Sequence, residues 1–146
     1  MKPRFLLTFF VAILLLAGCS GPTAPAAEVP VSQAPAAEAV ALELGPTVDV
    51  ETVAAVKYRD DVLVIDVREQ HEYDAGHIPG VTLIPMGTVP ARLDEIPTDK
   101  EVIVTCRSGN RSGQVTDFLR EQGFENVHNM AGGILDWEAS GYEVER

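Results

Sequence analysis

The chain has 146 residues and is acidic: 22 Asp and Glu residues outnumber 11 Lys and Arg residues, which gives a formal net charge of −11 at pH 7. A surface of this sign repels phosphate backbones and anionic lipid headgroups, so the composition argues against nucleic-acid binding and against docking of the folded part on a membrane. The sequence contains two cysteines, Cys19 and Cys106.

The N-terminus has the pattern of an export signal. Lys2 and Arg4 precede an uncharged apolar run over residues 5–16, which has the length of a signal-peptide core and is short for a membrane span. The sequence L-A-G-C that follows, ending at Cys19, resembles the lipobox of bacterial lipoproteins. The resemblance implies that residues 1–18 are removed and that Cys19 is lipidated. An ordinary cleaved signal and a retained helical anchor are the alternatives.

A lipidated Cys19 would place the protein in the bacterial cell envelope, facing outside the cytoplasm and attached to the membrane through the lipid. Ser20 stands where an aspartate often signals retention at the inner membrane, and this resembles sorting to the outer membrane in an organism that has one. Lipid on Cys19 would also leave Cys106 without a partner in the chain, so a structural disulfide is not expected.

Residues 19–46 are expected to form a tether. Proline recurs there without a period, and the apolar content is mostly alanine. Such a segment cannot bury enough surface to offset the entropy lost on ordering, and proline favours extended conformers. We therefore expect a semi-rigid spacer without a fold, followed by a single domain over residues 47–146.

Helix and strand patterns alternate in this domain. Short apolar runs rich in β-branched residues predict strands, and apolar residues at helical spacing predict helices. In chain order, the expected elements are a helix over 50–58 capped by Asp49, a strand over 62–66, a weaker strand over 81–84, a helix over 88–95 with Pro90 in its first turn, a strand over 102–105, a helix over 112–122 ended by Gly123, a weaker strand over 126–130 and a helix over 133–140. This alternation predicts an α/β domain of three layers, with a central, mainly parallel sheet flanked by helices.

Two segments that can carry chemistry follow predicted strands. The sequence D-V-R-E begins at Asp66, at the end of one strand, and Cys106 follows another. Because function collects at the carboxyl ends of parallel strands, we expect these segments to lie near each other.

The loop from Cys106 to Arg111 reads C-R-S-G-N-R. Gly109 and Asn110 tolerate left-handed backbone geometry, so the loop can turn successive N–H groups inward and form an anion-binding nest. The helix expected from Ser112 adds free N–H groups and the positive end of its dipole. A helix N-terminus and neighbouring cations lower the pKa of a cysteine thiol from about 8.5. The sequence therefore predicts that Cys106 is a nucleophilic thiolate at neutral pH.

Arg107 and Arg111 have a second predicted use, which is to attract an anionic substrate to the sulfur. Arg111 is expected to contribute more, because Arg107 can point to solvent. The alternative is that Cys106 is a small buried apolar residue at a strand end, as free cysteines often are. No other histidine or cysteine lies at metal-ligand spacing, so neither a metal site nor a cofactor is expected.

Several separate segments, in order, resemble the rhodanese-homology domains. The resembling segments are D-V-R-E from Asp66, G-H-I-P-G from Gly76, C-R-S-G-N-R-S from Cys106, G-F from Gly123 and G-G-I from Gly132. Together they span essentially the whole domain. The resemblance implies a single rhodanese domain with a central parallel sheet, in which Cys106 carries a sulfane sulfur as a persulfide held by the loop amides.

The implied activity is transfer of sulfane sulfur from thiosulfate or a similar donor to a thiol or cyanide acceptor. In this interpretation Cys106 is catalytic, the substrate is bound by Arg107, Ser108, Gly109, Asn110 and Arg111, and the loop is supported by Asp66, Arg68 and Ser112. His77 is read as a structural hydrogen-bond partner. The alternative is a non-enzymatic module of the same fold that binds a partner or senses redox or persulfide state, since fold alone does not decide function.

Loop length separates this pattern from the related dual-specificity phosphatases. In those enzymes five residues lie between the cysteine and the arginine of the loop, whereas here four residues lie between Cys106 and Arg111. The wider spacing would end at Ser112, which cannot clamp phosphate as an arginine does. The loop therefore resembles that of a sulfur-handling protein.

Overall fold

The structure is a computed structural model that describes residues 42–146. The expected signal over residues 1–18, Cys19 and the expected tether up to residue 41 lie outside the described residues, so these expectations stay predictions. Within residues 42–146, none of the helices has both the length and the apolar character needed to cross a membrane.

A five-stranded sheet forms the centre of the domain, with the strand order β1-β5-β4-β2-β3. Its strands are β1 (Thr47–Val48), β2 (Val62–Asp66), β3 (Thr82–Leu83), β4 (Glu101–Thr105) and β5 (Val127–Met130). Every neighbouring pair is parallel. The expected α/β class and parallel sheet are confirmed, and the central strands β2 and β4 lie where their apolar runs predicted them.

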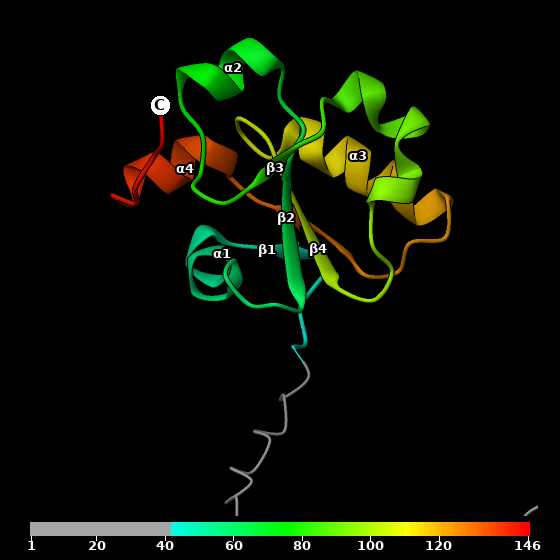
Figure 1. Cartoon of the computed structure of the whole chain (residues 1–146). Coiled ribbons are helices and arrows are strands. Elements are labelled where there is room, and N and C mark those ends of the chain that lie inside the picture. The colour runs from blue at the N-terminus through cyan, green and yellow to red at the C-terminus, as the bar shows by residue number, and fades with distance from the viewer. Residues whose placement is uncertain (1–41) are drawn as a thin grey trace, which may run out of the picture. The chain divides into compact units, whose positions relative to one another are not determined.

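Two apolar clusters cover the two faces of this sheet. Residues of a strand alternate between faces, so Val64 and Ile103 pack with α1 (Val50–Val56) and α4 (Gly133–Ala139), whereas Ile65 and Val104 pack with α3 (Asn110–Glu121). Figure 1 shows α1 and α4 on one side of the strands and α3 on the other. Burial on both faces explains why the central strands are continuously apolar.

The connection after β3 differs from the expected helix over 88–95. It forms two 3₁₀ helices, η1 (Met86–Ala91) and η2 (Leu93–Glu95). Pro90 lies inside η1 and has no N–H to donate, and the bonds that form are of the tighter i to i+3 kind, such as Arg92 N to Val89 O at 3.0 Å. The prediction of one α-helix here is therefore wrong.

Other predicted boundaries are close to those observed. Asp49 caps α1 as expected, with Oδ1 accepting from Thr52 N at 2.8 Å, and Gly123 follows the end of α3 with a positive φ of 95°. The sequence interpretation missed β1 and α2 (Gln70–Ala75). None of the residues of α2 is buried, so the helix has no apolar stripe to reveal it.

The folded part begins before Thr47. The lead-in segment, residues 42–46, contributes Leu42 and Leu44 to the apolar cluster under α1. Its Pro46 carbonyl accepts from Asn129 N at 3.1 Å, which places the segment beside β5. The tether expected through residue 46 therefore ends earlier, because two leucines among the alanines and prolines give its last residues apolar surface to bury.

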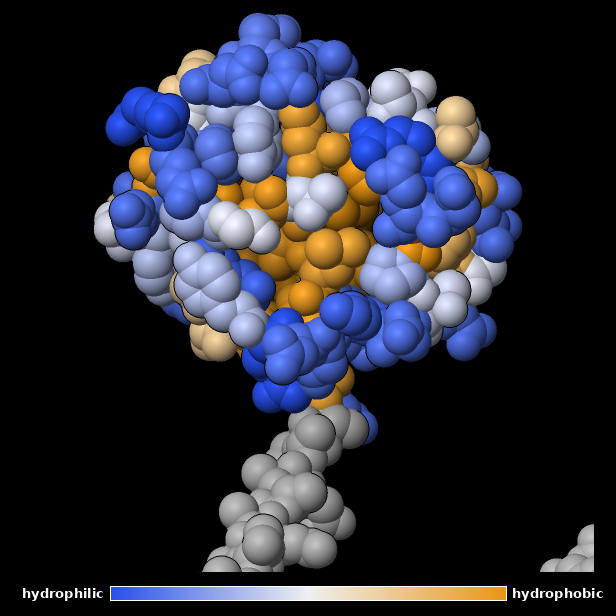
Figure 2. Space-filling model, viewed as in Figure 1, coloured by the Kyte–Doolittle hydropathy of each residue, from blue (hydrophilic) through white to orange (hydrophobic). Residues whose placement is uncertain are grey.

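Hydrophilic side chains cover most of the surface. Figure 2 shows them around the rim of one face, with an apolar area in the middle over β2 and β3. Among the described residues, Tyr58 and Leu135 are the large apolar side chains that are exposed. β3 lies at the sheet edge and has two residues, and so short an edge strand offers little backbone for pairing with another chain.

Candidate active site

Cys106 lies directly after β4, at the carboxyl end of a central strand. Its residue exposure is 1%. The sulfur accepts a hydrogen bond from Gly109 N at 3.2 Å, and Ser112 Oγ lies 3.3 Å from it. The loop therefore folds back on the sulfur and points donors at it, as the nest interpretation predicted.

These contacts decide the charge state of the thiol. Burial alone raises the pKa of Cys106 and is the largest single influence. The hydroxyl of Ser112 and the backbone N–H groups of Ser112, Ser108 and Gly109 oppose it, and together they hold the pKa below its ordinary value. The sequence interpretation also predicted a lowered pKa for Cys106. The cause in the structure is hydrogen bonding within the loop, whereas the sequence interpretation also invoked the arginine charges.

Gly109 gives the loop its shape. It is left-handed at φ 91° and immediately precedes α3, and a Cβ at this position would lie 3.2 Å from Gly132 N and 3.3 Å from Met130 O. A side chain is therefore opposed both by the backbone angle and by the neighbouring chain. Asn110 is the first residue of α3 and does not use the left-handed conformation that its type tolerates.

The start of α4 holds the other side of the loop. Ile134 N donates to Cys106 O at 2.9 Å, and Leu135 N donates to Arg107 O at 3.1 Å. A Cβ on Gly133 would collide with Cys106 O, so glycine allows this close approach. The sequence interpretation used the G-G-I segment at Gly132 for the family resemblance and did not connect its glycines with the Cys106 loop.

Arg111 is bound to a partner that sequence reasoning did not identify. Its two terminal nitrogens each donate to a carboxylate oxygen of Glu72 at 2.7 Å. This bidentate contact lowers the pKa of Glu72 to about 2. The charge expected to hold an anionic substrate is therefore largely compensated by α2.

Asp66 and Arg68 form a buried ion pair, with Arg68 Nη2 2.7 Å from Asp66 Oδ2. The remaining donors of Arg68 reach carbonyl oxygens of Glu72 and Gly76, at 3.2 and 2.8 Å. The pair thus holds α2 and the turn after it. The prediction was that the pair supports the Cys106 loop. Its support of the loop is indirect, through Glu72 and Arg111.

The remaining predicted residues have simpler surroundings. Arg107 and Ser108 are exposed. His77 stacks on Tyr73, with 3.7 Å between ring centroids, and its Nε2 lies 3.2 Å from Glu145 Oε2, in keeping with the structural role expected for it. Within residues 42–146, no group of three or more His, Cys, Asp or Glu side chains is placed to hold a metal ion.

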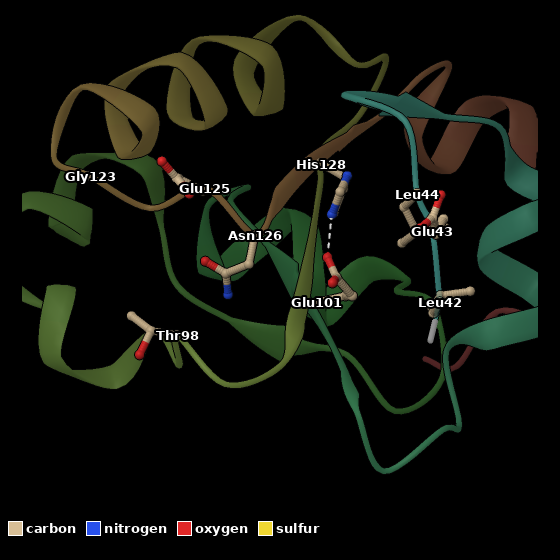
Figure 3. A pocket seen from close by; sticks show the side chains of 9 residues that line it. All are labelled: Leu42, Glu43, Leu44, Thr98, Glu101, Gly123, Glu125, Asn126 and His128. Atoms are coloured by element: carbon tan, nitrogen blue, oxygen red, sulfur yellow. Dashed lines mark hydrogen bonds and ion pairs between the residues drawn. The ribbon is translucent and has the colours of Figure 1, made fainter. Parts of the chain in front are cut away.

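Two of the cavities lie at opposite ends of the sheet. The smaller, about 270 Å³, adjoins the nucleophile's loop at Arg107 and lies between residues of α2 and α4. The larger, about 590 Å³, is at the amino end of β4 and β5, where the lead-in segment meets Glu101 and His128 (Figure 3). Since Cys106 follows the carboxyl end of β4, the smaller of these two cavities is the one nearer to it.

The model of the rhodanese-like domain matches residues 49–140. This chain belongs to the rhodanese-like domain family. A sulfurtransferase of Allochromatium vinosum is 41% identical over 85 residues, which cover 58% of this chain and 79% of that protein. Thiosulfate sulfurtransferase GlpE of Pseudoalteromonas translucida is 38% identical over 89 residues, covering 60% and 85%.

Solved structures agree with the family assignment. The rhodanese-related protein of Thermoplasma volcanium superposes with a TM-score of 0.62 at 29% identity, over 69% of this chain and 98% of that one. The family resemblance seen in the sequence, from the Asp66 segment to the Gly132 segment, is thereby confirmed.

Proposed function

We propose that this rhodanese-like protein is a sulfurtransferase, in which Cys106 takes sulfane sulfur from thiosulfate or a similar donor and passes it to a thiol or to cyanide. The observation that carries the proposal is the sulfur at the carboxyl end of β4, with Gly109 N and Ser112 Oγ at 3.2 and 3.3 Å. Relatives named as sulfurtransferases support the general class of reaction.

In the first half-reaction the Cys106 thiolate attacks the outer sulfur of thiosulfate. A bond forms between the two sulfurs, the sulfur–sulfur bond of the donor breaks, and its electron pair leaves with sulfite. In the second, an acceptor such as cyanide attacks the outer sulfur of the persulfide. That bond breaks, thiocyanate leaves, and the electron pair returns to Cys106 as the thiolate.

The loop donors act on the charge that persists through this cycle. Anionic sulfur is present as the thiolate and again on the persulfide, so N–H groups fixed around it need no reorganisation between steps. Gly109 N is held by the left-handed turn, and Ser112 Oγ is held within the first turn of α3. Among the two loop arginines, Arg107 has the exposed guanidinium and is better placed to attract a small anion than Arg111, which Glu72 compensates.

We further propose that the protein is a lipoprotein of the cell envelope, attached through Cys19 and facing outside the cytoplasm. The L-A-G-C sequence after an uncharged run supports this proposal. The acidic composition supports attachment through the lipid in preference to a basic protein surface.

The test is cyanide-dependent release of thiocyanate from thiosulfate by the purified protein. Activity is expected in the native protein and none in Cys106→Ala, with equal thermal melts as a folding control. Mass spectrometry after thiosulfate alone should find one added sulfur atom, located at Cys106. A folded protein that neither gains this sulfur nor releases thiocyanate would overturn the proposal and favour a non-enzymatic module.

A further inference from the structure

We propose that the cavity between α2 and α4 binds a zwitterionic amino thiol, such as free cysteine, as the sulfur acceptor. The inference rests on the proposed sulfurtransferase function and names the acceptor class for the same nucleophile. The cavity is lined by Arg68, Glu72, Ala75, Gly76, Arg107, Ile134, Leu135 and Glu138. Its volume of about 270 Å³ is just below the usual range of small-molecule sites, roughly 300–1,000 Å³, and suits a ligand of amino-acid size.

Four lining residues are charged, and they fall into two kinds. Arg68 is paired with Asp66, and Glu72 is paired with Arg111. Arg107 and Glu138 are both exposed, and within the described part of the chain neither side chain has a hydrogen bond or an ion pair. The cavity therefore presents one available cation and one available anion.

The charges of Arg107 and Glu138 would be matched by a ligand that carries both a negative and a positive group. Arg107 suits a carboxylate, which its planar fork can bind through two hydrogen bonds, and Glu138 suits an ammonium. Between them Leu135, which is 43% exposed, supplies apolar surface together with Ile134. A small anion such as thiosulfate would satisfy Arg107 alone, whereas an amino thiol satisfies both charges.

The walls of the cavity are fixed to the backbone around the nucleophile. Arg107 follows Cys106 in the chain, and Leu135 N holds the Arg107 carbonyl at 3.1 Å. On the other wall, Glu72 holds Arg111, in the first turn of α3 that follows the loop, at 2.7 Å. A ligand bound here therefore lies against Arg107, the residue that follows Cys106, and the proposal places its thiol toward the outer sulfur of the persulfide.

The transfer step follows from this placement. The acceptor thiol loses its proton to solvent, and its sulfur attacks the outer sulfur of the Cys106 persulfide. A new sulfur–sulfur bond forms on the acceptor, the bond within the Cys106 persulfide breaks, and the electron pair returns to the Cys106 thiolate. The product is the persulfide of the amino thiol.

The experiment uses full-length protein preloaded with persulfide, so that the donor step does not enter. Single-turnover rates are measured with cysteine, with cysteamine, which lacks the carboxylate, and with 3-mercaptopropionate, which lacks the ammonium. Each second-order rate constant is divided by that for 2-mercaptoethanol, which carries neither a carboxylate nor an ammonium, on the same variant, so that a general change in persulfide reactivity cancels. The variants are Glu138→Gln and Arg107→Gln, with Glu121→Gln on the exposed end of α3 as the matched control.

Glu138→Gln should lower the ratios for cysteine and cysteamine by about two- to fivefold, as expected for exposed ion pairs, and leave that for 3-mercaptopropionate unchanged. Arg107→Gln should lower the ratios for cysteine and 3-mercaptopropionate and leave that for cysteamine unchanged. Equal changes for all three thiols, or none, would reject this acceptor site while transfer to cyanide continues. Failure to load the persulfide at all would instead reject the proposed function, and the acceptor site with it.

Discussion

Replacing Ser112 with alanine removes one of the donors that point at the Cys106 sulfur, at 3.3 Å, and leaves Gly109 N in place. The hydroxyl stabilises the thiolate more than the thiol, so its loss should raise the pKa of Cys106. Hydrogen bonds to charged groups contribute about 1.5–3 kcal/mol, and one pKa unit corresponds to about 1.4 kcal/mol. The upper limit of the expected rise is therefore about two units.

The hydrogen bonds of the Ser112 hydroxyl favour a rise in the Cys106 pKa well below this upper limit. Ser112 Oγ also lies 3.1 Å from Gly109 O, so its single proton is shared between two acceptors. We expect a rise of about one unit, since half of a contact worth about 3 kcal/mol corresponds to about one pKa unit. Ser112 is fully buried, so water cannot easily replace the lost donor.

The assay is the pH dependence of Cys106 alkylation by iodoacetamide, supported by thiolate absorbance across the same pH range. Ser108→Ala is the matched control, because Ser108 is an exposed serine of the same loop and acts on the sulfur through its backbone N–H. The control should titrate as the native protein does. A Ser112→Ala titration that coincides with the native curve would refute the role assigned to the hydroxyl.

Three further predictions concern other parts of the chain. Cys19→Ser should abolish labelling with a lipid precursor and move the protein to the soluble fraction, and a mutant that stays membrane-bound and normally processed would contradict the lipoprotein proposal. Arg111 lowers the pKa of Glu72 from 4.5 to about 2. The pair therefore stabilises the fold above about pH 4.5, and this stabilisation is lost as the pH falls toward 2. Between pH 5 and 3, the free energy of unfolding should fall less in Glu72→Gln than in the native protein, as measured by urea unfolding. His128→Ala should loosen the lead-in segment, because His128 Nδ1 lies 2.6 Å from Gly45 O, and limited proteolysis should cut there faster than in the exposed His71→Ala control.

Local sequence patterns determined much of this fold and site. A strand repeats every two residues and a helix about every 3.6, so burial imprints these periods on contiguous residues such as 62–66. The Cys106 loop was predictable for the same reason, since the nucleophile, the left-handed Gly109 and the start of α3 lie within a few residues of one another. The class of the domain and the placement of Cys106 at the carboxyl end of a central strand thus followed from the sequence by itself.

Contacts between distant residues were decided by the tertiary structure. Glu72 and Arg111 are 39 residues apart, and no local pattern joins them, because α2 buries none of its residues and is held in place by the buried pair of Asp66 and Arg68. The sequence indicated two free arginines beside the sulfur, whereas packing compensates one of them and leaves Arg107 facing the cavity with Glu138. The charge that a substrate meets depends on which side chains the fold brings together, and a count of charges along the loop does not contain that information.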